Sequence, residues 1–152
     1  MQSDTWNYTN WFNGKPEQRI LNWRRYRHHI SDNHLEHVAT DWANCPVISN
    51  LLQPDDPTDW PDAWTLIGNG SYDDVGRALG MFYTLYYSDY RHRDDMVLKC
   101  YMDRKNHQYL NLLFCEQEKY MLNYSLGEVV NTTAIEPTAI LLNTLTAKDI
   151  KI

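Results

Sequence analysis

The stretch from Gly68 to Ser88 reads GNGSYDDVGRALGMFYTLYYS, a glycine-rich turn that leads directly into an amphipathic segment. Glycines permit the backbone conformations that a tight turn requires. Ser71 is followed three residues later by Asp74, a pattern like a capping box, in which side-chain oxygens accept the free amides of the first helical turn. The pattern predicts that a helix begins at Ser71.

The residues after this turn recur at helical spacing. The apolar positions are Val75, Ala78, Leu79, Phe82 and Leu85. Gly76 and Gly80 lie about one turn apart and leave a groove in which another element can pack closely. This stretch is therefore predicted to be the central buried helix.

Two shorter helices are expected before the turn. Pro16 favours a helix start, and that helix is expected to end near two adjacent histidines. Asp32 or Asn33 would cap a second helix, which Pro46 interrupts and residues 47–52 are expected to resume. Its apolar face comprises Leu35, Val38, Ala39 and Trp42. The proline-rich segment Gln53 to Pro61 is predicted to be a loop.

After the central helix the pattern changes to that of strands. Met96 to Met102, His107 to Phe114 and Lys119 to Tyr124 are predicted to form an antiparallel meander. Shorter apolar elements follow at residues 129–130 and 138–145. We therefore expect an α+β fold, with N-terminal helices and one central buried helix packed on a small antiparallel sheet. Residues 15–152 would form a single domain, preceded by an arm of residues 1–14.

The composition disfavours several classes of function, namely binding to nucleic acid, insertion into a membrane and metal or redox chemistry at cysteines. The chain has 152 residues and a formal net charge of -6, which disfavours attraction to nucleic acid. No apolar run approaches membrane-spanning length, and the N-terminus lacks the features of a signal peptide, so we expect the chain to remain in the cytoplasm where it is made. Its 3 cysteines have no metal-binding or redox spacing and are expected to be buried thiols. No cofactor is predicted.

Metal binding is also not predicted. Two groups of residues were weighed for it: the histidines His28, His29, His34 and His37, and the aspartates Asp55, Asp56, Asp59 and Asp62. The histidine spacing fits no common zinc site. The aspartates lack the glycine and terminal glutamate of an EF-hand loop, which favours a solvated acidic loop.

Three short segments resemble the core of the transglutaminase-like branch of the papain-like superfamily. They are Gly70 to Asp74, His107 to Tyr109 and Tyr120 to Asn123. In that family a cysteine nucleophile stands at the start of a helix, and two strands supply a histidine and an aspartate. The resemblance implies a hydrolase or acyl-transfer core and places Tyr72, His107 and Asn123 at the three catalytic positions.

The departures from the family pattern predict that this chemistry is lost. Tyr72 stands where the family has its cysteine, and a phenol with a pKa of about 10 is a poor nucleophile at neutral pH. Asn123 stands where the family often has aspartate. The sequence therefore predicts a pseudoenzyme with vestigial residues. The alternative is an enzyme in which Ser71 or Cys100 serves as the nucleophile.

The chain contains 6 tryptophans and 11 tyrosines, many for its length. Aromatic side chains of this kind are enriched at protein interfaces. The residues predicted to contact partners are Trp6, Tyr8, Trp11, Phe12, Trp60 and Trp64. The N-terminal arm that carries the first four is expected to dock against a partner or against the domain itself.

The chain as a whole resembles small uncharacterised proteins of contractile-tailed bacteriophages, particularly those of cyanobacteria. The resemblance implies a non-enzymatic component of the virion, in a neck, tail or baseplate, that contacts other virion proteins in a multi-copy assembly. Such a protein would be synthesised in the host cytoplasm. A soluble module that binds a host protein remains an alternative.

Overall fold

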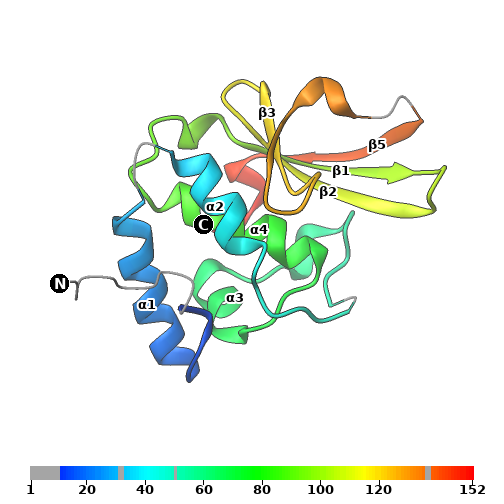
Figure 1. The fold of residues 1–152 in the computed structure, drawn as a ribbon. Coiled ribbons are helices and arrows are strands. Elements are labelled where there is room, and N and C mark those ends of the chain that lie inside the picture. The colour runs from blue at the N-terminus through cyan, green and yellow to red at the C-terminus, as the bar shows by residue number, and fades with distance from the viewer. Residues whose placement is uncertain (1–10, 31–32, 50, 136–137) are drawn as a thin grey trace.

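The computed structural model describes residues 11–30, 33–49, 51–135 and 138–152. In these ranges the chain forms four α-helices and a five-stranded sheet (Figure 1). The helices are α1 (Pro16–His28), α2 (His34–Trp42), α3 (Ala63–Asn69) and α4 (Asp74–Tyr86). The strands are β1 (Val97–Asp103), β2 (Gln108–Cys115), β3 (Tyr120–Leu122), β4 (Val129–Asn131) and β5 (Ala139–Leu145).

The sheet has the order β4-β3-β2-β1-β5, and every neighbouring pair is antiparallel. The helices lie on one side of it, and α4 packs directly against its inner face (Figure 1). The predicted α+β fold is therefore confirmed. The predicted three-strand meander forms the middle of the sheet, and the two later apolar elements become its edges.

The central helix begins later than the sequence predicts. Its N-cap is Asp73, whose Oδ1 accepts the amide of Gly76 at 2.7 Å. The other carboxylate oxygen accepts the amides of Leu51 and Leu52 at 2.7 and 2.6 Å. Ser71 is therefore not the cap, because the residues before Asp73 are extended.

The segment before the helix pairs with another part of the chain. Tyr72 forms a parallel bridge with Val47, in which the Tyr72 amide donates to Pro46 O at 2.8 Å and the Ile48 amide donates to Tyr72 O at 3.0 Å. The prediction that residues 47–52 resume a helix is therefore wrong. In the described part of that range the backbone is not helical, since its amides at residues 48, 51 and 52 donate to Tyr72 and Asp73 instead of to a helical turn.

The groove predicted on α4 is occupied by Trp42 of α2. A Cβ atom added at Gly80 would lie 2.1 Å from the Trp42 ring, so only glycine permits this contact. The Trp42 indole N–H donates to Thr84 Oγ1 at 3.0 Å, and the indole N–H of Trp23 on α1 donates to the same oxygen at 3.0 Å. Thr84 in turn donates to Gly80 O at 2.7 Å. One hydroxyl thus joins three helices.

Replacing Thr84 with valine is expected to destabilise the fold by about 2–5 kcal/mol, because two buried indole N–H groups lose their acceptor. Valine keeps the shape of the side chain, so the loss reports hydrogen bonding and not a cavity. Urea unfolding followed by tryptophan fluorescence measures the difference. A Thr84→Ser variant keeps the acceptor and should recover most of the stability.

The aromatic residues at the start of the described chain belong to the core. Trp11 is fully buried and Phe12 is 6% exposed. The Trp11 ring lies 5.0 Å from the Trp42 ring and 5.9 Å from the Tyr26 ring. Residues 11 and 12, assigned from the sequence to a separate arm, are therefore part of the packed domain and are not free to contact a partner.

Of the other residues predicted to contact partners, one is buried and one is exposed. Trp60 is 5% exposed, and its indole N–H donates to Gln53 O at 2.8 Å, which fixes the proline-rich loop to the core. Trp64 is 44% exposed and is the predicted contact residue that the structure leaves accessible. Trp6 and Tyr8 lie outside the described residues.

Helix α3 was not expected from the sequence. Asp62 caps it by accepting the Thr65 amide at 2.8 Å, and Gly70 ends it with a φ of 80°. Its seven residues are too few to establish a helical period, whereas its Asp and Gly boundary signals were present.

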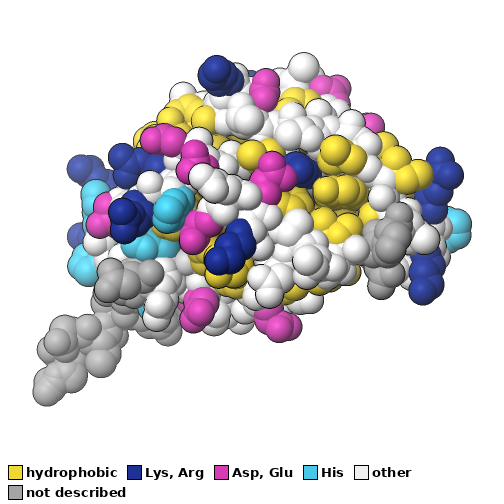
Figure 2. All heavy atoms as spheres, turned by 90° about the horizontal axis from the view of Figure 1, so that it is seen from above, with side chains coloured by type: hydrophobic (Ala, Val, Ile, Leu, Met, Phe, Trp, Pro, Cys, Tyr) yellow, Lys and Arg dark blue, Asp and Glu magenta, His cyan; other side chains and the backbone are white. Residues whose placement is uncertain are grey.

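The outer face of the sheet carries a second, smaller core. Leu112, Phe114 and Met121 are fully buried there, beneath Tyr124, Val130 and Ile135. Figure 2 looks down on this side and shows hydrophobic side chains exposed over part of it. Within the described residues, no helix has the length and apolar character needed to span a bilayer.

Candidate functional site

The start of α4 faces two strands through a cluster of polar side chains. Asp74, the first residue of the helix, accepts the Asn111 side-chain amide at Oδ2 (2.7 Å) and the Asn123 amide at Oδ1 (3.0 Å). Asn123 Nδ2 also lies 2.9 Å from Asn111 O. We call these three residues the Asp74 cluster. It stands where a helix N-terminus and two strands converge, as in the core that the sequence resembles.

The local structure explains each member of the cluster. A carboxylate is stabilised at the N-terminus of a helix by the helix dipole, which suits Asp74. Asn111 is 7% exposed and lies on the face of β2 that packs on α4, two residues before the fully buried Leu113. Asn123 follows β3 and has a φ of 73°, a conformation that asparagine tolerates better than most residues. The asparagines are therefore held by the sheet, and they fix the helix start to it.

A cleft of about 830 Å³ opens beside this cluster. The Asp74 side chain is 46% exposed and is one of the residues that line it. One wall is formed by residues 51–54, and the other by residues 107–111 with Asn123 and Tyr124. Among the described residues that line it there is no lysine, arginine, serine or cysteine. The cleft therefore presents a hydrogen-bonded carboxylate among apolar and amide side chains, with His107, Tyr109 and Tyr124 also lining it.

Of the three vestigial residues predicted from the sequence, only Asn123 belongs to the cluster. Tyr72 is 1% exposed, and its hydroxyl donates to Ile67 O at 3.0 Å. Burial raises the pKa of the Tyr72 phenol above its ordinary value. His107 is an exposed residue of the β1–β2 turn with a φ of 54°, and not the first residue of a strand. The position that faces the helix start from β2 is Asn111.

The sequence analysis did not identify Asp74 and Asn111 as members of this site. The sequence predicts that the central helix begins at Ser71 and that a strand begins at His107, whereas α4 begins at Asp74 and Asn111 lies within β2. The sequence signal for Asp74 is the pair of adjacent aspartates: Asp73 caps the helix, so Asp74 is its first residue. Asn111 stands out as an amide within an otherwise apolar strand pattern, Leu-Asn-Leu-Leu-Phe.

The three cysteines offer no activated thiol. Cys45 is 4% exposed, Cys100 is 5% exposed and Cys115 is fully buried. Cys100 pairs with Asn111 across β1 and β2, but burial, together with the nearby charges of Asp55 and Asp74, raises the pKa of its thiol to about 12. At neutral pH these thiols are protonated, whereas the thiolate is the nucleophile.

The native thiols are therefore expected to react slowly. Iodoacetamide should alkylate the folded chain at neutral pH at least ~10-fold more slowly than the same chain in denaturant, where the thiols have a pKa of about 8.5. Intact-mass spectrometry against time measures both rates. A thiol that alkylates rapidly in the folded chain well below pH 8.5 would contradict the arrangement described above.

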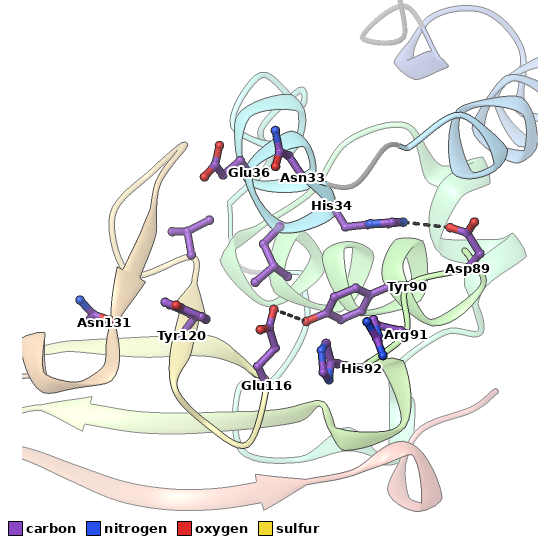
Figure 3. A pocket seen from close by; sticks show the side chains of 12 residues that line it. Asn33, His34, Glu36, Asp89, Tyr90, Arg91, His92, Glu116, Tyr120 and Asn131 are labelled. Carbon is purple, nitrogen blue, oxygen red and sulfur yellow. Dashed lines mark hydrogen bonds and ion pairs between the residues drawn. The ribbon is translucent and has the colours of Figure 1, made fainter.

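A second cleft, of about 640 Å³, lies between the start of α2, the segment after α4 and the β2–β3 turn (Figure 3). In it the Tyr90 hydroxyl donates to Glu116 Oε2 at 3.0 Å, and His34 Nε2 lies 2.9 Å from Asp89 Oδ1. Figure 3 shows the Glu116 side chain directed at Tyr90. The described residues lining this cleft include no serine, threonine or cysteine, so it offers acid–base and ion-pair chemistry.

The turn that carries Glu116 is strained. Glu116, Gln117 and Glu118 have φ values of 57°, 59° and 64°. The left-handed conformation costs a non-glycine residue about 1–2 kcal/mol.

In the described ranges, no group of three or more His, Cys, Asp or Glu side chains could hold a metal ion, in this cleft or elsewhere.

The comparisons with known proteins bear on the fold. No family model matches the chain, and no curated protein matches it. Among solved structures, Legionella pneumophila LapG is similar, with a TM-score of 0.65 and 13% sequence identity over 87% of this chain and 75% of LapG. At this identity the likeness shows the fold alone.

Proposed function

We propose that this chain is a non-enzymatic interaction protein built on a transglutaminase-like fold. The observation that carries the proposal is the Asp74 cluster. At the helix start, where the resembled family has a cysteine, this chain has a carboxylate that accepts two side-chain amides at 2.7 and 3.0 Å.

The chemistry of the cluster supports the absence of catalysis. The Asn111 side chain is an amide and cannot take a proton from a nucleophile at neutral pH, as a histidine would. Both carboxylate oxygens of Asp74 accept a side-chain amide of an asparagine. The residues therefore join α4 to the sheet without an acid–base pair.

The alternative is an acyl-transfer enzyme that uses Ser71 or Cys100. Burial keeps Cys100 protonated, since its pKa is raised to about 12. Ser71 precedes the helix by three residues, and among the described contacts no hydrogen bond joins its hydroxyl to His107 or Asn123. A serine nucleophile needs a base within hydrogen-bond reach. The geometry therefore favours the interaction protein.

The setting that we propose is a multi-copy assembly, in a bacteriophage virion as the resemblance to phage proteins implies. Exposed apolar side chains at Trp64 and on β5 would supply contact area there. The alternative, a soluble module that binds a host protein, implies a much smaller native mass than a virion does. One experiment therefore separates the two settings.

That experiment is gradient sedimentation of the untagged chain in its source material, with mass spectrometry of every fraction. The virion proposal predicts that the chain travels with particles far larger than itself. The host-binding module predicts a complex of moderate mass that contains a host protein. A chain found only as a free species would overturn both proposed settings.

A further inference from the structure

Within the part of the chain that the structure describes, β5 is an edge strand with no strand paired on its outer side. It occupies the end of the order β4-β3-β2-β1-β5 and has seven residues, whereas the opposite edge strand, β4, has three. Its sequence, AILLNTL, contains no charged residue and no proline. Natural edge strands usually carry such residues, because these prevent pairing with another chain. The protective feature present is a bulge at Leu142 opposite β1.

The part of β5 near the β1–β2 turn is apolar on both faces. Residues directly opposite one another in an antiparallel sheet point to the same face. Ile140 therefore lies in one cross-strand row with Met102 and Tyr109, and Leu141 lies in a row on the opposite face. Ile140, Leu141 and Leu142 are 38%, 47% and 44% exposed. This end of the sheet extends beyond the helices (Figure 1).

The other half of β5 is already occupied. The Asn143 side-chain amide donates to Asp55 O at 3.3 Å, and the Asn143 side-chain oxygen accepts the Thr144 amide at 2.9 Å. Leu145 is 7% exposed. The length of strand open to pairing is therefore Ala139 to Leu142.

Opposite charges lie at the two ends of this open segment. The β1–β2 turn carries Arg104 and Lys105 and lies next to Ala139, since Asp103 pairs with Ala139. At the other end, the loop beside Asn143 carries Asp55 and Asp59, both exposed. If two copies pair through β5 in antiparallel orientation, the basic turn of each copy lies toward the acidic loop of the other.

We propose that the chain self-associates through β5, by antiparallel pairing of Ala139–Leu142 with the same segment of a second copy about a two-fold axis. The pairing satisfies the free backbone groups of both edges and covers the apolar side chains on both faces. The charges at the ends fix the orientation. The inference deepens the proposed assembly role, but the two fail separately, since self-association is measured on the purified chain without any particle.

The experiment is sedimentation velocity of the purified full chain over a range of micromolar concentrations. We expect a reversible dimer, and a Leu141→Lys variant should raise its dissociation constant at least ~10-fold, because a charged side chain within the open edge segment opposes its pairing with another chain. Leu126→Lys is the matched control, since Leu126 is 59% exposed and lies outside β5. It should leave the dissociation constant unchanged.

A charge exchange tests the orientation. The double variant Arg104→Glu and Lys105→Glu should weaken the dimer, and adding Asp55→Lys and Asp59→Lys should restore it. A chain that is monomeric at every concentration would overturn the proposal, as would a dimer that Leu141→Lys does not weaken. So would a strand of another protein found paired with β5 in the native complex.

Discussion

A Gly80→Ala substitution is expected to reduce the free energy of unfolding by at least ~3 kcal/mol, although alanine favours a helix by about 1 kcal/mol over glycine. The new Cβ would lie 2.1, 2.5 and 2.6 Å from three atoms of the Trp42 ring. That ring cannot move aside easily, because its N–H is bonded to Thr84 and its centroid lies 5.0 Å from that of Trp11 and 5.1 Å from that of Tyr72. Urea unfolding followed by circular dichroism measures the change.

Gly68→Ala is the matched control for this prediction. Gly68 lies in α3, and the nearest atoms to an added Cβ are 3.8 Å away, in Ile20 and Pro16. This variant should be neutral or stabilised by up to about 1 kcal/mol. If Gly80→Ala behaves like Gly68→Ala, then α2 does not pack on α4 as described.

Introducing a cysteine, a histidine and an aspartate at the Asp74 cluster is expected to produce a reactive thiol. The triple variant Asp74→Cys, Asn111→His and Asn123→Asp places a thiol at the N-terminus of α4, with a histidine at the position that now lies 2.7 Å from Asp74. The helix dipole and the histidine both lower a thiol pKa. We expect iodoacetamide to alkylate this thiol at least ~10-fold faster at neutral pH than any native cysteine, with an apparent pKa below about 8.5.

Tyr72→Cys is the informative comparison, because the sequence resemblance alone places the nucleophile there. Its side chain would lie in a site where Tyr72 is now 1% exposed, so its thiol should stay unreactive in the folded chain. Near-UV circular dichroism checks that both variants keep their tertiary structure. A reactive cysteine at 72 together with an unreactive one at 74 would show that the Asp74 cluster is not the equivalent of the catalytic position.

The fold was largely predictable from local patterns. The apolar spacing of α4 and the paired glycines identified the central helix, and the close contact at Gly80 follows from its lack of a side chain. Helix boundaries were less predictable, since Ser71 and Asp73 both carry capping side chains. Asp73 becomes the cap because its second oxygen also binds the amides of Leu51 and Leu52, a contact between residues about twenty positions apart.

The candidate site was less predictable than the fold. Asn111 joins Asp74 only through the register of β2 against α4, and register depends on the whole sheet. The fate of the N-terminal aromatics likewise depends on long-range packing. Trp11 and Phe12 look like contact residues in a polar segment, but Trp42, Tyr26 and Tyr72 supply an aromatic site for them within the chain.

The central claim, that this chain is not an enzyme of the acyl-transfer type, is tested most directly by covalent labelling of the wild-type chain. The folded chain would be treated with a fluorophosphonate, which reacts with activated serines, and with a peptide chloromethyl ketone, which reacts with activated thiols. The products would be read by intact mass and peptide mapping. Our account predicts no adduct at Ser71, Cys45, Cys100 or Cys115. An adduct at Ser71 or Cys100 that is lost when the chain is denatured before labelling would contradict it.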